Sequence, residues 1–255
     1  MIKLFLYFTF FMMGLASAKE LSPFVSNTPN QMHYFYVDNI EFRYYQPDLS
    51  QEDIRIFWKD SADEPYASLD NLIAKQKEKG EELLFAMNGG IYSDDATPGG
   101  LYIEDYKLIK DVNLNRGKDN FHTKPNGIFY MQDDIPYIVK SENFQYNTHI
   151  SMGIQSGPLL MNDGQIYNHF TNASTSEYIR NGVCIDAHNK LYFVQSLNPS
   201  NMYRFAKGVQ GQLACQKLLY LDGFLSHMQA AHGENKGTQF RPFVSIIATI
   251  KKKPK

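Results

Sequence analysis

The chain carries many short apolar runs and few long ones. Its clearest run, Leu83 to Met87, opens directly onto Asn88-Gly89-Gly90. An uninterrupted apolar run of this length, bounded by turn-forming residues, is typical of a buried strand. Runs rich in β-branched and aromatic residues predict one or two further strands within 31–48, and others at 53–60 and 243–250.

Helical periodicity is found at two places. At 68–80, Ser68 is placed to cap a helix, apolar residues share one face and Gly80 ends the pattern. Residues 204–217 show a second helical pattern, which two glycines weaken. Each predicted helix leads into a strand, and each strand ends in an Asx-Gly pair.

Turn-forming residues separate paired apolar stretches at 100–110, 127–140, 157–167 and 181–195. Such spacing predicts β-hairpins. Together with the two helices, these hairpins predict an α+β fold: a mostly antiparallel sheet system with two principal helices in a single domain.

The N-terminus predicts a signal peptide at 1–18. Lys3 gives it a positive start, an apolar stretch follows at 4–15, and Ala16-Ser17-Ala18 forms a cleavage site. The apolar stretch is too short for a membrane span, and no Cys follows it to carry a lipid. We therefore expect a periplasmic or secreted protein whose mature domain is 19–255.

Charge argues against a nucleic-acid partner. The formal net charge is −2, and it becomes −3 when Lys3 is removed with the signal peptide. No basic block precedes the terminal lysines at 251–253, so the chain lacks the cluster of Lys and Arg side chains that binds nucleic-acid phosphates.

The two cysteines, Cys184 and Cys215, leave two alternatives open. An exported chain permits a disulfide between them, and two buried thiols are equally compatible with their apolar surroundings. Because each lies in the middle of a predicted element rather than in a loop, we expect them to be unpaired.

Five loops place a polar side chain beside a glycine at a predicted strand boundary. Glycine lets backbone approach a ligand closely, amides and hydroxyls bind sugar hydroxyls, and arginine binds phosphate. Taken singly, each loop is better explained as a plain turn. The loops are Asn88-Gly89-Gly90, Lys124-Pro125-Asn126-Gly127, Gln155-Ser156-Gly157-Pro158, Arg180-Asn181-Gly182 and Asp222-Gly223.

The segments MNGGIY, PNGIF, QSGPLL, RNGVCID and LYLDG, in this order, resemble the phosphodiester glycosidase family. The resemblance covers about residues 80–250. One departure concerns the last motif, which many members continue with glycines and serines and which here continues as Phe224-Leu225-Ser226-His227. This variant resembles an exported bacterial subgroup of the family.

The resemblance implies hydrolysis of a sugar–O–phosphate bond in an envelope polysaccharide or glycolipid. A phosphate ester leaves as a weak base, so the site needs a strong general acid less than ordinary glycosidases do. Asp222 is the first candidate carboxylate, Asp94 with Asp95 the second, and Arg180 the candidate phosphate ligand. The residues expected to orient or admit the substrate are Asn88, Gly89, Gly90, Asn126, Gly127, Gln155, Ser156, Gly157, Gly223 and His227.

Each role has a structural alternative. Asp222 could shape a turn, Arg180 could form a surface ion pair, and Asp94 could be a solvated loop charge. His227 could act as an acid–base group or be purely structural. A non-catalytic glycan-binding protein could use the same loops, so it remains the alternative to the enzyme.

Other site classes are disfavoured. The seven histidines include no pair at zinc-ligand spacing, and we expect neither a metal nor another cofactor. Ser156 lacks the strand-turn-helix setting of a serine nucleophile.

Overall fold

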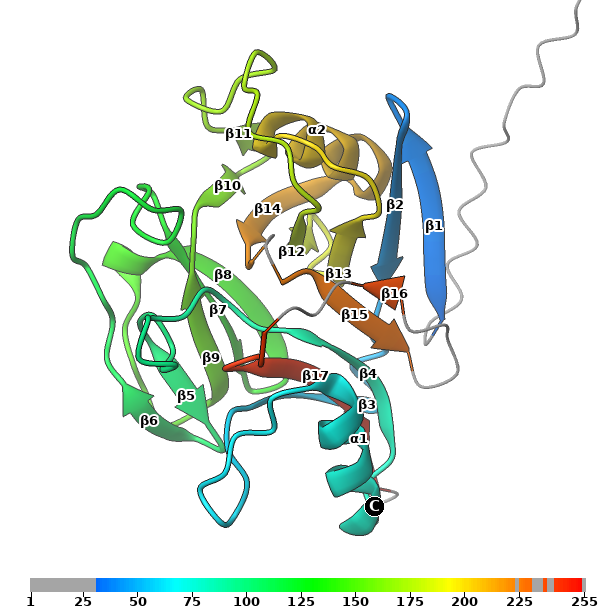
Figure 1. Ribbon diagram of the computed structural model, residues 1–255, viewed down its shortest axis with the longest axis vertical. Coiled ribbons are helices and arrows are strands. Elements are labelled where there is room, and N and C mark those ends of the chain that lie inside the picture. The colour runs from blue at the N-terminus through cyan, green and yellow to red at the C-terminus, as the bar shows by residue number, and fades with distance from the viewer. Residues whose placement is uncertain (1–30, 223–224, 231–235, 238–240, 254–255) are drawn as a thin grey trace, which may run out of the picture.

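The computed structural model describes residues 31–222, 225–230, 236–237 and 241–253 (Figure 1). The predicted signal peptide and Gly223 lie outside the described residues.

Three antiparallel sheets form the framework of the described part of the chain. The seven-stranded sheet has the order β1 (Met32–Val37), β2 (Ile40–Tyr45), β13 (Leu191–Ser196), β12 (Asn181–Asp186), β14 (Cys215–Tyr220), β10 (Leu159–Asn162), β11 (Gln165–Ile166). One five-stranded sheet has the order β16 (Lys236–Gly237), β15 (His227–Ala230), β4 (Leu83–Asn88), β17 (Ile246–Lys251), β3 (Glu52–Phe57). The other has the order β6 (Lys107–Lys110), β5 (Tyr102–Glu104), β9 (Ile150–Ser156), β7 (Gly127–Gln132), β8 (Ile135–Lys140), and the 3₁₀ helix η1 (Ser141–Asn143) follows β8.

The predicted hairpins are confirmed. The pairs β5–β6, β7–β8, β10–β11 and β12–β13 are each antiparallel and lie in the predicted ranges. Their turns place Asp or Asn at positive φ, as at Asp163 and Asn189, where these residue types are tolerated.

The first predicted helix is confirmed as α1 (Leu69–Glu78). Ser68 caps it, because its Oγ accepts a hydrogen bond from the Asn71 backbone N–H at 3.1 Å. Gly80 follows at φ +72°, a conformation that favours glycine after a helix end.

The second helix is shorter than predicted. α2 (Met202–Leu213) ends at Ala214, which adopts the left-handed conformation, and the strand β14 begins at Cys215. The apolar residues after 213, read as helix from their spacing, are strand residues that pair with β12 on one side and β10 on the other.

This boundary also corrects the prediction of unpaired cysteines. Cys215 lies in a strand paired with β12, which carries Cys184, and the two residues form a disulfide with Cα atoms 5.8 Å apart. That separation falls in the range that a disulfide requires.

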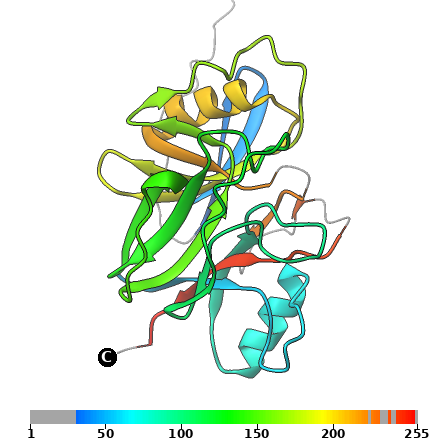
Figure 2. The ribbon, with the colours of Figure 1, turned by 90° about the vertical axis from the view of Figure 1, so that its left-hand side faces the viewer.

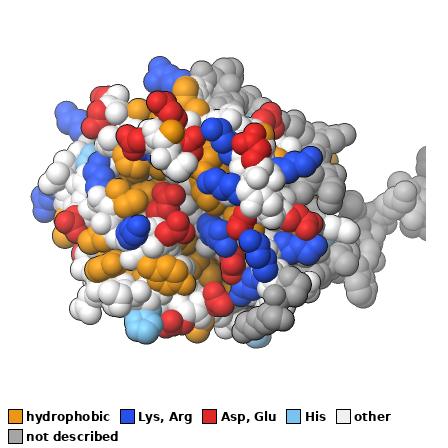
Figure 3. All heavy atoms as spheres, turned by 90° about the horizontal axis from the view of Figure 1, so that it is seen from below, with side chains coloured by type: hydrophobic (Ala, Val, Ile, Leu, Met, Phe, Trp, Pro, Cys, Tyr) orange, Lys and Arg blue, Asp and Glu red, His pale blue; other side chains and the backbone are white. Residues whose placement is uncertain are grey.

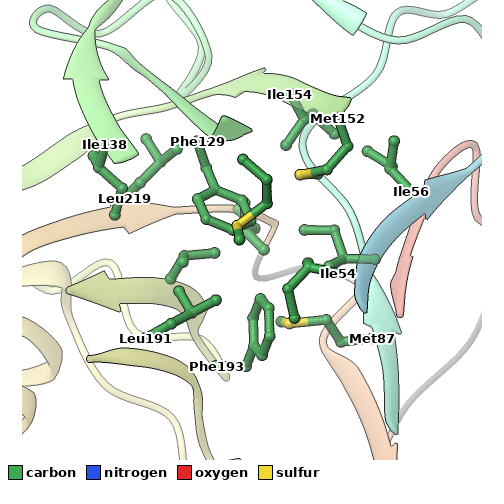
Figure 4. Packing of buried hydrophobic residues seen from close by; sticks show 14 of the residues in the cluster. Ile54, Ile56, Met87, Phe129, Ile138, Met152, Ile154, Leu191, Phe193 and Leu219 are labelled. Carbon is green, nitrogen blue, oxygen red and sulfur yellow. The ribbon is translucent and has the colours of Figure 1, made fainter. Parts of the chain in front are cut away.

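The three sheets meet at one hydrophobic core. Phe193 and Leu219 enter it from the seven-stranded sheet, Met87 from β4, and Phe129 and Ile154 from the third sheet (Figure 4). The rings of Phe129 and Phe193 pack edge to face with centroids 6.1 Å apart. The core thus fixes the ends of strands from different sheets relative to one another.

Each helix covers the outer face of a sheet (Figures 1 and 2). α2 packs on the seven-stranded sheet through Phe205 and Val209, and α1 packs on the sheet that contains β4 through Leu69 and Leu72. The mostly antiparallel sheets and the two principal helices are therefore as predicted. Strands predominate to the point that the α+β label fits only loosely.

Acidic and basic side chains are intermixed on the face seen from below (Figure 3). No helix in the described part of the chain is long and apolar enough to cross a membrane.

Candidate functional site

The ends of strands from two sheets are joined by buried amide groups. Asn88, the last residue of β4, accepts hydrogen bonds through its Oδ1 from Asn181 Nδ2 at 2.6 Å and from the His227 backbone N–H at 2.9 Å. Asn181 in turn accepts a hydrogen bond through its Oδ1 from the Asp222 backbone N–H at 3.0 Å. This network, which we call the Asn88–Asn181 bridge, holds the backbone at Asp222 against the end of β4.

Ser156, the last residue of β9 in the third sheet, forms hydrogen bonds to the residues beside the Asn88–Asn181 bridge. Its Oγ donates to the Leu221 carbonyl at 2.8 Å and accepts from the Ile91 N–H at 3.3 Å. A Cβ atom added to Gly90 would lie 2.9 Å from the Ser156 Cβ. Gly90 therefore serves close packing between strand ends, and the same loop can still present its backbone to a ligand.

Asp222 lies at a small pocket that these strand ends enclose. Asn88, Gly89, Gly90, Tyr92 and Asp222 are among its lining residues. Asp222 is half-buried. Burial raises the pKa of the Tyr92 phenol, the negative charge of Asp222 raises it further, and Arg241 opposes both effects. The Asp222 carboxylate and the Tyr92 phenol thus share this pocket, and Arg241 lines the neighbouring cavity together with Tyr92.

The predicted residue His227 borders the same pocket region. Its backbone N–H belongs to the Asn88–Asn181 bridge, and its buried ring lies edge to face with Phe243 at 6.0 Å. The structure thus brings together six of the predicted residues, which are Asn88, Gly89, Gly90, Ser156, Asp222 and His227.

Gln155 and Asn126 bind neighbouring loops. Gln155 Oε1 accepts from the Leu101 and Asn113 N–H groups at 3.0 and 2.8 Å, and its Nε2 donates to the Asn113 carbonyl at 2.7 Å. Asn126 Nδ2 donates to the Phe121 carbonyl at 2.9 Å. Their side chains therefore shape the loops beside the site.

Gly127 and Gly157 belong to the same region. Gly127 begins β7 and pairs with Ser156, and Gly157 follows Ser156 directly. A Cβ atom on Gly157 would lie 2.8 Å from the Asn126 Cβ, so this glycine permits close packing of the two loops.

Arg180 lies on the other face of the seven-stranded sheet. Its Nη1 donates to the Tyr220 hydroxyl at 3.1 Å, and its Nε donates to the Ser200 carbonyl at 3.0 Å. Its Nη2 donates to the Ser176 carbonyl at 2.7 Å. Neighbouring strand residues point to opposite faces, so Asn181 faces Asn88 while the Arg180 guanidinium is buried on the side of α2. Its donors are already engaged by protein oxygens, which leaves them poorly placed for a substrate phosphate.

Asp94 and Asp95 occupy an exposed loop that closes between Tyr92 and Pro98. Asp95 Oδ1 accepts hydrogen bonds from the Thr97 hydroxyl and backbone N–H at 2.8 and 3.2 Å, which lowers the pKa of Asp95. Asp95 therefore stabilises its own turn, and Asp94 lies at the exposed tip.

Three residues of this site received no role from the sequence. Asn181 lay within a recognised loop, but its partner Asn88 is 93 residues away in the chain. Tyr92 lay within the MNGGIY motif. Arg241 follows no pattern that distinguishes it from a surface arginine, and only the fold places it beside Tyr92.

Within the described residues, no group of three His, Cys, Asp or Glu side chains is arranged to hold a metal ion.

The sequence matches the phosphodiester glycosidase family model over residues 81–249, which confirms the resemblance drawn from the five motifs. A curated relative, the uncharacterized protein YigE of Escherichia coli (strain K12), is 35% identical over 208 residues, which cover 82% of this chain and 81% of the relative.

Two solved structures share the fold. The catalytic domain of zebrafish N-acetylglucosamine-1-phosphodiester alpha-N-acetylglucosaminidase, auto-inhibited by its pro-peptide, aligns with a TM-score of 0.52 and 14% identity over 90% of this chain and 85% of that one. A hypothetical protein from Synechocystis aligns with a TM-score of 0.57 and 12% identity over 87% of this chain. The alignment spans 62% of that protein's length.

Proposed function

Because the chain belongs to the phosphodiester glycosidase family, we propose that it is an exported hydrolase that cleaves a sugar–O–phosphate bond. The observation that carries the proposal is the position of Asp222 at a pocket where the ends of β4 and β14 are joined by the Asn88–Asn181 bridge. The substrate is a glycosyl phosphodiester of an envelope polysaccharide or glycolipid.

In this proposal the bond between the anomeric carbon and the phosphate oxygen breaks. That oxygen stays with the phosphate, which leaves as a phosphomonoester, and a water molecule adds its oxygen to the anomeric carbon and releases a proton. Asp222 stabilises the positive charge that builds up at the sugar carbon, or aligns the water. A positioned carboxylate of this kind contributes about 10²- to 10⁴-fold in rate.

The neighbouring residues keep the carboxylate in place. The Asn88–Asn181 bridge fixes the backbone at Asp222, and Ser156 fixes the preceding residue, Leu221. Gly89 and Gly90 present backbone to the sugar. Asn126 and Gln155 act by shaping the loops beside the site.

Action outside the cytoplasm fits the disulfide between Cys184 and Cys215, because disulfides persist in oxidising compartments. Together with the sequence pattern at 1–18, it supports a periplasmic or secreted location.

The test is an activity screen with aryl- and nucleotide-linked sugar-1-phosphates, in which free sugar and phosphomonoester are both measured. Asp222→Asn keeps the side-chain size but removes the charge, and it should lower turnover about 10²- to 10⁴-fold with little change in stability. Asp163→Asn is the matched control, since Asp163 lies in an exposed turn of the β10–β11 hairpin. Sugar binding without turnover in the wild-type protein would reject the enzyme in favour of the glycan-binding alternative.

A further inference from the structure

We propose that the cavity beside Asp222 binds an apolar leaving group whose phosphate is held by Arg241 and Tyr92, so that the substrate is a sugar phosphodiester of a lipid-like or aryl alcohol. This inference rests on the proposed function and names the substrate class of the same site.

The cavity lies next to the pocket at Asp222, because the two share lining residues. It has a volume of about 440 Å³, within the range of small-molecule sites. Tyr92, Phe243 and Val244 line both spaces, so a group bound in the cavity lies on the other side of these residues from the small pocket at Asp222.

The lining of the cavity favours an apolar occupant. Trp58, Phe243 and Pro242 contribute aromatic and aliphatic surface, and Arg241 is the single charged residue among the described residues that line it. A second sugar would bring several hydroxyls to walls that offer few hydrogen-bond partners, and unpaired polar groups are costly to bury. An alkyl or aryl group has no such cost and gains from the removal of its surface from water.

Arg241 and Tyr92 lie where the phosphate would be. Both line the cavity, and Tyr92 also lines the pocket that holds Asp222. Arg241 is exposed, in contrast to the buried Arg180, so its guanidinium is accessible to a solute. Guanidinium groups bind phosphate through two parallel hydrogen bonds, and a phenol adds one donor.

The first experiment compares hydrolysis of sugar-1-phosphate diesters that carry methyl, butyl or octyl groups. We expect kcat/KM to rise by up to about fourfold for each added methylene until the cavity is filled. Ala96 lines the cavity mouth, is exposed and has φ +57°, where Asn is tolerated. Ala96→Asn should reduce the preference for octyl, whereas Arg241→Gln should raise KM for all three diesters about 10- to 100-fold and leave the preference unchanged.

Hydrolysis at equal efficiency for all three chain lengths would overturn this inference and leave the proposed function standing. Failure to hydrolyse any diester would count against the proposed function, so a second measurement tests the cavity without turnover.

Trp58 is the single tryptophan of the chain and lines the cavity, so its fluorescence reports occupancy. Titration with octyl phosphate below its micelle concentration should shift the emission and show binding at least about tenfold tighter than methyl phosphate. Arg241→Gln should weaken octyl phosphate binding about 10- to 100-fold. Equal affinity for the two phosphates, or no binding of octyl phosphate, would overturn the inference.

Discussion

The Asn88–Asn181 bridge makes a quantitative prediction for Asn181→Ala. The substitution removes the hydrogen bond to Asn88 at 2.6 Å and the acceptor of the Asp222 N–H at 3.0 Å. Asn88 Oδ1 keeps the His227 N–H as a donor, so it remains satisfied, whereas the Asp222 N–H loses this acceptor.

One lost buried hydrogen bond costs about 1 kcal/mol, and a partly buried donor left without its acceptor costs about 1 to 2 kcal/mol more. We therefore expect Asn181→Ala to lower the free energy of unfolding by about 2 to 3 kcal/mol. For a chain of this size the corresponding fall in Tm is about 4 to 12 °C.

Urea unfolding and steady-state kinetics, measured where both proteins remain folded, test this reasoning. Asn181 acts through Asp222, so kcat should fall while KM changes little. Asn162→Ala, at the half-buried last residue of β10, removes a hydrogen bond to Asp163 and should change stability by less than about 0.5 kcal/mol. If Asn181→Ala lowered the free energy of unfolding no more than this control, the stabilising role of the Asn88–Asn181 bridge would be refuted. An unchanged kcat would refute the role of the bridge in positioning Asp222.

Three further predictions concern residues around this framework. Gly90→Ala should destabilise the fold by about 1 to 3 kcal/mol in thermal or urea unfolding, because its Cβ would meet neighbouring atoms at 2.9 Å, whereas Gly211→Ala, with nothing within 4 Å, should stabilise it by about 0.5 to 1 kcal/mol. Burial raises the pKa of Glu104 from 4.5 to about 7, so the folded state retains a proton that the unfolded chain has lost, and stability should fall as the pH rises from about 4.5 to 7. Glu104→Gln should remove that part of the pH dependence, and an unchanged profile would contradict the assignment. Cys184→Ser combined with Cys215→Ser should cost about 3 to 4 kcal/mol, and reduction of the wild type should raise its mass by two hydrogens; no mass change would show that the thiols are free.

Local patterns predicted the parts of the fold that local interactions determine. Ser68 caps α1 through a hydrogen bond to Asn71, three residues further along the chain. The turn at Asp163 joins β10 and β11, which are consecutive strands. The boundary after Leu213 was not predictable in this way, because the apolar residues that follow it suit a helix or a strand equally. These residues form a strand because they pair with β12, which lies far from them in the sequence.

The same distinction applies to the site. Asn88 and Asp222 were recognisable because each follows an apolar strand and precedes glycine. The sequence did not show to which face of the sheet Arg180 and Asn181 point. Adjacent residues along an extended chain point to opposite faces, and the sequence does not say which face meets another sheet. Arg241 was not recognisable either, because its place beside Tyr92 at the cavity comes from the fold and from no local pattern.

The bond that is cleaved is the central claim, and hydrolysis of an aryl sugar-1-phosphate diester in oxygen-18 water tests it most directly. If water attacks the sugar carbon near Asp222, the bridging oxygen stays on phosphorus, and mass spectrometry should find no oxygen-18 in the released phosphomonoester. Oxygen-18 in the phosphomonoester would place the attack at phosphorus and contradict a glycosidase.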